Sequence, residues 1–207
     1  MNRRLIFKIS MLVSSLIILV CITFLTSCKC RACEDKEESS VPLEVLTKAD
    51  SFIVSSTGKE FFEKYITVDF FRTKNTPPYY EMAYKFFVPE KPYVNAIIKF
   101  TVDSVGNVLK NRDVIGIPDC VNFPEYCEFN IDEQSARRVA KEKNLKEGIR
   151  DWDTVFQWDF KLQRYVWRIL STLTELGSGD NYKATGQEIV IDPNTGEMFA
   201  LNDWRVN

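Results

Sequence analysis

The sequence predicts an α+β fold in which a helix packs on an antiparallel sheet, arranged as two related halves behind an export signal and a tether. Three observations lead to this prediction. The first 28 residues have the layout of an export signal, helix-start signals precede β-rich runs, and two hairpins of the same kind close the two halves. We place the boundaries at 1–27 for the signal peptide, 28–42 for the tether, 43–117 for the first half, 118–130 for a Cys-containing bridge and 131–207 for the second half.

The composition excludes several kinds of site. The 207-residue chain has 27 Lys and Arg, 29 Asp and Glu, six Cys and no His. Without His there is no Ser-His-Asp or Cys-His nucleophile and no His-bearing zinc site. The net charge of −2 gives no electrostatic reason to expect a nucleic-acid partner. A content of 45% hydrophobic and 27% charged residues is ordinary for a globular protein, so we expect a packed core.

The N-terminus predicts export and lipid anchoring. Arg3, Arg4 and Lys8 precede an uncharged stretch over 9–26, as in a signal with its positive charge on the cytoplasmic side. The stretch ends in Leu-Thr-Ser-Cys at Cys28, which resembles a bacterial lipobox. This resemblance implies lipidation of Cys28 and cleavage before it, with several acyl chains as a firm membrane anchor. The alternative is an uncleaved transmembrane helix.

Cleavage before Cys28 has two consequences. The mature chain keeps 24 basic and 29 acidic residues, a net charge of −5. Lys29 follows the lipidated Cys, so the acidic retention signal of some inner-membrane lipoproteins is missing. We therefore expect a cell-envelope protein anchored in the outer membrane rather than the inner one, on either the periplasmic or the surface face.

The tether carries two features with alternative interpretations. An acidic cluster over 34–38 is either a sorting signal toward the cell surface or simply part of a solvated linker. Cys30 and Cys33 form a CxxC pair. A redox or zinc site would need a βαβ context or two more ligands, so a local disulfide or two unpaired thiols is favoured.

The first half is predicted to contain one short helix followed by strands. Thr57 and Glu60 have capping-box spacing and precede an aromatic run, which predicts a helix that begins at Thr57. The β-rich runs and the turns between them follow in order: strands at 66–71, 79–88 and 96–102, a turn at 74–78, and a hairpin turn at 103–107.

The second half repeats this order. Asp132 is expected to cap a helix, and Gly148 is a candidate for the residue after its C-terminus. Alternating apolar residues then predict two strands, with Thr154, Phe156, Trp158 and Phe160 in one and Tyr165, Trp167 and Ile169 in the next. The closing hairpin has its turn at 192–196 and matches the one at 100–109 in kind, which indicates duplicated units.

The bridge holds two cysteines, Cys120 and Cys127, in a Pro-containing loop. In an oxidising compartment this spacing favours a disulfide between them. Two buried free thiols are the alternative.

The second half resembles a PepSY domain. The resemblance covers 131–200 and rests on the acidic-capped, Ala-containing helix at 132–140, the strand at 165–169, and the closing hairpin with Asp192-Pro-Asn-Thr-Gly-Glu197 in its turn. It implies a small α+β unit outside the cytoplasmic membrane, and some members of the family are pro-segments that restrain peptidases. Two such units side by side would resemble β-lactamase-inhibitor-like proteins, which grip an enzyme with a sheet. The family supplies no catalytic residues.

Aromatic residues are the candidate contact residues. Trp158 and Trp167 are expected in the core because they alternate, whereas Trp152 and Trp204 lie near element ends and are expected to be exposed. Tyr79 and Tyr80 form either an exposed aromatic loop or the start of a strand.

The turn at Asp192 is interpreted as structural rather than as a calcium loop. It is shorter than a calcium loop and lacks the alternating acidic residues. We expect Asp192 to bind backbone amides within the turn.

These features predict a non-enzymatic, lipid-anchored envelope protein that acts by contact with another protein, with restraint of a peptidase or another envelope enzyme as one such role. The alternative is a module that binds a small molecule or a peptidoglycan fragment in a pocket between helix and sheet. A third hypothesis is an enzyme whose catalytic groups are carboxylates alone, for example those of Asp151 and Asp153. No cofactor, metal or nucleic acid is expected, and the expected partners are the membrane, through the anchor, and an envelope protein.

Overall fold

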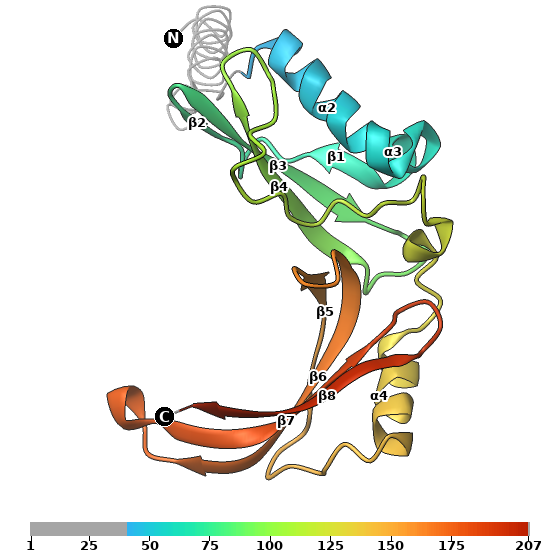
Figure 1. Ribbon diagram of the computed structural model, residues 1–207, viewed down its shortest axis with the longest axis vertical. Coiled ribbons are helices and arrows are strands. Elements are labelled where there is room, and N and C mark those ends of the chain that lie inside the picture. The colour runs from blue at the N-terminus through green and yellow to red at the C-terminus, as the bar shows by residue number, and fades with distance from the viewer. Residues whose placement is uncertain (1–40, 207) are drawn as a thin grey trace, which may run out of the picture. The chain divides into compact units, whose positions relative to one another are not determined.

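The computed structural model describes residues 41–206, and these form an α+β fold with three α-helices and two four-stranded antiparallel sheets (Figure 1). The predicted α+β class, with helices packed on antiparallel sheets, is therefore confirmed for this part of the chain. Cys28, Cys30, Cys33 and the signal at 1–27 lie outside the described residues. Among residues 41–206 no helix combines the length and the apolar character needed to cross a membrane.

The first half builds its sheet around one long strand. Its elements are α2 (Leu43–Thr57), α3 (Lys59–Tyr65), β1 (Ile66–Val68), β2 (Lys74–Thr76), β3 (Tyr79–Phe87) and β4 (Asn95–Asp103). The short strands β1 and β2 pair with different stretches of one edge of β3, and β4 pairs along its other edge. The predicted strands at 79–88 and 96–102 are confirmed within one residue at each end.

The predicted start of the helix in this half was wrong. A whole helix, α2, precedes the expected one, and Thr57 is the last residue of α2. The Thr57 hydroxyl donates to the carbonyl oxygen of Ile53 at 3.0 Å, so it does not cap the following helix. Gly58, with φ of 82°, separates the two helices. Such a positive φ suits glycine, which has no Cβ to clash with the backbone.

The strand predicted at 66–71 ends early, at Val68. The Asp69 carboxylate accepts hydrogen bonds from the backbone N–H groups of Phe71 and Arg72, both at 3.1 Å, and thereby folds a turn. Lys74–Thr76, expected as a turn, pairs with β3 instead, and the chain reverses at Pro77 and Pro78.

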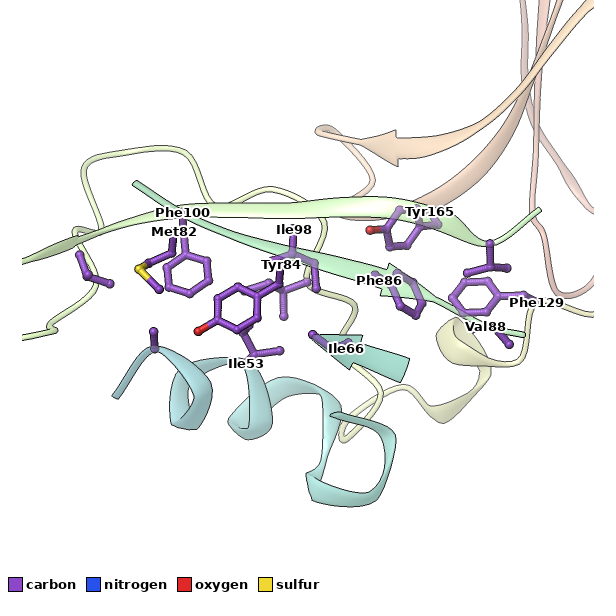
Figure 2. Packing of buried hydrophobic residues seen from close by; sticks show 14 of the residues in the cluster. Ile53, Ile66, Met82, Tyr84, Phe86, Val88, Ile98, Phe100, Phe129 and Tyr165 are labelled. Atoms are coloured by element: carbon purple, nitrogen blue, oxygen red, sulfur yellow. The ribbon is translucent and has the colours of Figure 1, made fainter. Parts of the chain in front are cut away.

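The first core lies between the helices and the sheet (Figure 2). Ile53 of α2 belongs to one buried cluster with Tyr84 and Phe86 of β3 and Phe100 of β4, all fully or almost fully buried. The Tyr84 hydroxyl donates to the Asp50 carboxylate of α2 at 2.7 Å. Burial raises the pKa of Asp50, although the hydrogen bond from Tyr84 acts in the opposite direction. The helix is therefore held to the sheet by apolar packing and one polar pair.

The second half is a four-stranded meander with one helix. Its elements are α4 (Glu133–Glu142), β5 (Asp153–Asp159), β6 (Arg164–Leu176), η3 (Gly179–Asn181), β7 (Lys183–Ile191) and β8 (Met198–Val206), and the short 3-10 helix η2 (Pro124–Cys127) lies in the bridge before it. The strand order is β5-β6-β7-β8. Ala136 and Ala140 of α4 pack on Trp167 and Ile169 of β6 in a second core.

The predicted start of α4 is confirmed and its predicted end is wrong. Asp132 accepts a hydrogen bond from the Ser135 amide at 2.8 Å. The helix ends at Glu142, and Asn144, with φ of 62°, takes the left-handed position expected of a C-terminal glycine. Gly148 serves another purpose, because a Cβ there would lie 2.5 Å from the carbonyl oxygen of Thr172.

The closing hairpin follows the sequence prediction. Asp192 accepts a hydrogen bond from the Asn194 amide at 2.7 Å, and Gly196 has φ of 75°. The predicted bonding of Asp192 to a backbone amide within the turn is thus confirmed. Phe160, predicted in a strand, lies in the turn after β5 and is exposed.

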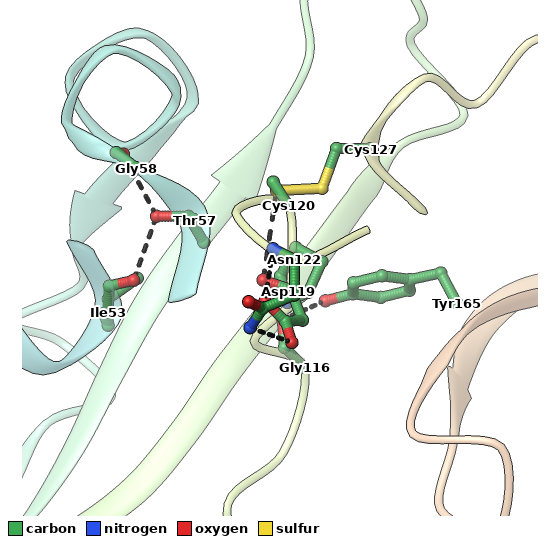
Figure 3. Close-up of a disulfide and its surroundings, with 10 residues drawn as sticks. Ile53, Thr57, Gly58, Gly116, Asp119, Cys120, Asn122, Cys127 and Tyr165 are labelled. Atoms are coloured by element: carbon green, nitrogen blue, oxygen red, sulfur yellow. Dashed lines mark hydrogen bonds between the residues drawn. A yellow bond between two sulfur atoms is a disulfide. The ribbon is translucent and has the colours of Figure 1, made fainter. Parts of the chain in front are cut away.

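Cys120 and Cys127 form the predicted disulfide (Figure 3). The loop that it closes contacts both halves. The amide of Val121 donates to the carbonyl oxygen of Ser56 in α2 at 2.9 Å, and the Tyr126 ring lies 3.8 Å from the Arg164 guanidinium at the start of β6. The bridge is therefore a packed connection between the halves rather than a free linker.

Aromatic side chains join the two cores. Tyr165 of β6 is buried in the first core, 5.5 Å from Phe86 between ring centroids, and its hydroxyl donates to the carbonyl oxygen of Gly116 at 2.9 Å (Figure 3). Phe129 of the bridge packs on both rings. Phe86 and Tyr165 both lie on the helix-facing sides of their sheets, so the helix-facing sides of the two sheets pack against each other here. We call the opposite side of each sheet its outer face.

Candidate functional site: a groove on the outer face of the second sheet

The tryptophans expected to be exposed are half-buried. The Trp152 indole N–H donates to the carbonyl oxygen of Lys146 at 3.1 Å, and its ring packs on the second core. The Trp204 ring covers Gly186, where a Cβ would lie 2.4 Å from the ring, and its N–H donates to the carbonyl oxygen of Gln187. Both rings pack within the chain, since each covers a neighbouring strand or loop and its N–H donates a hydrogen bond to a backbone carbonyl. The expectation that they are exposed was wrong.

The other aromatic candidates lie in strands, as one of the two interpretations of Tyr79 and Tyr80 predicted. Tyr79 and Tyr80 are half-buried at the start of β3, and Tyr80 packs on the first core. Trp167 is buried as predicted, and Trp158 is half-buried against the first core. Within residues 41–206, the contacts of these residues do not join them to Trp152 or Trp204 in one surface site.

The structure instead shows a groove that sequence reasoning missed. It has a volume of about 600 Å³ and is open on one side. Residues from all four strands and from the turn between β5 and β6 line it: Gln157, Trp158, Asp159, Phe160, Lys161, Leu162, Arg168, Glu188, Val190, Phe199, Ala200 and Asn202. The strand register explains the lining residues from β6 and β7. Trp167, Ile189 and Ile191 face α4, so their neighbours Arg168, Glu188 and Val190 face outward.

A triad of charges, Asp159, Arg168 and Glu188, forms the floor of the groove. The Arg168 guanidinium donates to Asp159 at 2.7 Å and to Glu188 at 2.6 Å. The three side chains are 11%, 26% and 16% exposed, respectively. Two carboxylates share one guanidinium, so the floor is rigid and carries one excess negative charge.

The turn between β5 and β6 forms one wall. Asp159 also accepts hydrogen bonds from the backbone amides of Lys161 and Leu162, both at 2.9 Å. This bonding fixes the turn and leaves Phe160 at 56% and Leu162 at 40% exposure. The result is two apolar side chains beside a charged floor.

This arrangement suits binding of a polypeptide segment. Contact surfaces of this kind combine apolar anchors with polar groups that fix orientation. Among residues 41–206 no cluster of three or more His, Cys, Asp or Glu side chains is placed to hold a metal ion.

The sequence contains one signal that could have found the groove. Asp159, Arg168 and Glu188 occupy the positions that alternate with the buried residues of three different strands. Their charges therefore mark the outer face, but the pairing among them depends on the strand register. No family model matches the chain, and no curated protein matches it significantly.

Proposed function

We propose that this protein is a lipid-anchored component of a bacterial cell envelope that binds another protein through the outer face of its second sheet. Restraint of a peptidase or another envelope enzyme is the role implied by the PepSY resemblance. The groove carries this proposal, because it offers Phe160 and Leu162 as exposed apolar anchors next to a fixed charged floor.

The order of elements supports the PepSY-like interpretation. In each half the helices precede an antiparallel sheet: α2 and α3 come before β1 to β4, and α4 comes before β5 to β8. The turn from Asp192 to Glu197 closes the second half with the hydrogen bonds expected of it.

The alternative ligand is a small molecule or a peptidoglycan fragment. The volume of the groove lies within the range of roughly 300–1,000 Å³ that is typical of such sites. Small-molecule pockets are, however, mostly apolar and enclose their ligand. An open groove with an ion triad in its floor fits a polypeptide better.

Photo-crosslinking in living cells tests the contact. A photoreactive amino acid at position 162, at the wall of the groove, is expected to give one discrete protein adduct. The matched control is position 141, an exposed lysine on α4 at the helix side of the same sheet. Equal adducts from both positions, or none from position 162, would overturn the proposed contact, and a low-mass adduct at position 162 would support the small-ligand alternative.

A further inference from the structure

The first half exposes two phenylalanines in a rigid turn. Phe70 is 51% and Phe71 is 85% exposed in the turn between β1 and β2. The turn is fixed from within, because the Asp69 amide donates to the carbonyl oxygen of Ala83 at 2.8 Å and the buried Thr73 bonds the same residue of β3. Two large apolar side chains with this much exposed surface, on a turn that is fixed to β3, mark a candidate contact surface.

Cations gather on the adjacent outer face of the first sheet. Arg72, Lys74 and Lys99 line a shallow depression of about 160 Å³ together with Glu81 and Asp113. The register places Lys85 on the same face, beside Ile97 of β4. The Arg112 guanidinium lies 4.7 Å from the centre of the Tyr79 ring, at the start of β3.

Most of these cations lack an acidic partner. Within residues 41–206, Arg72 forms an ion pair with Asp69, whereas Lys74, Lys85, Lys99 and Arg112 have no carboxylate within salt-bridge distance. With Asp69, Glu81 and Asp113 as the acidic residues of this region, the surface carries a net positive charge. This charge contrasts with the net charge of −5 predicted for the mature chain.

The described chain begins at the end of the first sheet where β2 pairs with β3. The Lys48 side chain in α2 donates to the carbonyl oxygen of Val105 at 2.7 Å, which places the first turns of α2 beside the turn after β4. β2 pairs with the start of β3, which itself pairs with the end of β4. Cys28 precedes Val41 by 13 residues, so an extended chain reaches at most about 45 Å from a lipid at Cys28 to this end.

We propose that the Phe70-Phe71 turn and the basic outer face of the first sheet lie on the anionic lipid surface in which Cys28 is anchored. This inference rests on the lipid anchor in the proposed function. Aromatic rings are favoured at the membrane–water interface, and lysine and arginine are attracted to anionic headgroups. The contact orients the domain on the membrane, which an acyl anchor on a tether does not do by itself.

Vesicle co-sedimentation tests this inference with residues 29–207, which lack the lipid and contain both cores and the disulfide. We expect binding to phosphatidylglycerol-containing vesicles, weakened by salt, and little binding to phosphatidylcholine alone. The combined F70S and F71S change is expected to weaken binding about tenfold. K74Q with K99Q is expected to weaken it severalfold, mostly at low salt.

Leu176→Ser is the matched control, because Leu176 is 73% exposed in the second sheet. Circular dichroism shows whether each variant is folded. Absence of binding to anionic vesicles, or equal binding by the Phe70/Phe71 variant and the control, would overturn the inference. The anchor is tested separately: if full-length Cys28→Ala matures and attaches as the parent chain does, the anchor fails whatever the vesicles show.

Discussion

Replacing Tyr165 by Ala is expected to lower the free energy of unfolding by about 3–5 kcal/mol, the usual cost of removing a large aromatic side chain from a core. Tyr165 comes from the second sheet but is 2% exposed within the first core, where it contacts Phe86, Phe129 and Phe156. Its loss leaves a cavity where the two halves meet. Urea denaturation followed by circular dichroism measures the effect.

Tyr165→Phe is the matched control for the hydroxyl alone. It keeps the ring packing and removes the hydrogen bond to Gly116, so the expected loss is about 1 kcal/mol. A loss below about 1 kcal/mol for Tyr165→Ala would contradict the shared packing of the two halves.

Replacing Arg164 by Met is expected to cost about 3–5 kcal/mol, because it leaves a buried carboxylate without its partner. Arg164 and Asp192 are 11% and 7% exposed and lie 2.9 Å apart. The guanidinium also stacks on Tyr126 in the disulfide loop and lies 5.1 Å from the Phe199 ring. This one side chain thus connects the bridge, β6 and the closing hairpin.

Two further variants make this expectation specific. Lys59→Met removes an ion pair whose side chains are 79% and 63% exposed, and it should change stability by less than about 1 kcal/mol. Adding Asp192→Asn to Arg164→Met removes the unpaired charge and should restore part of the loss. If the Arg164 and Lys59 variants are equally stable, the buried pair does not support the bridge.

The strands of this fold were predictable because their side chains alternate. Trp167, Ile169, Ile189 and Ile191 face the second core at every other position, as the sequence suggests. The cap at Asp132 was predictable as well, because the interaction is local to one turn of helix.

Helix α2 could not be predicted on the same grounds. It has Pro42 at its N-cap position without a side-chain hydrogen bond, and it ends in a run rich in β-branched residues and serine. Its stability comes from Val45, Ala49 and Ile53, which are buried against a sheet formed by later residues. Tertiary packing here overrides local propensity.

The groove was hidden for a related reason. Asp159, Arg168 and Glu188 are far apart in sequence, and only the register of β5, β6 and β7 brings them within hydrogen-bond distance. The exposed tryptophans expected from the sequence are covered for the same reason, since Trp204 packs over a glycine in the neighbouring strand.

The central claim is that the groove on the second sheet binds a protein partner, and the most direct test is the affinity of the crosslinked partner for three forms of the chain. We expect the combined F160S and L162S variant to bind at least about tenfold more weakly than the parent chain, because two apolar anchors are lost. Leu176→Ser, an exposed apolar position outside the lining of the groove, should bind as the parent does. Equal affinity of all three forms would contradict the claim.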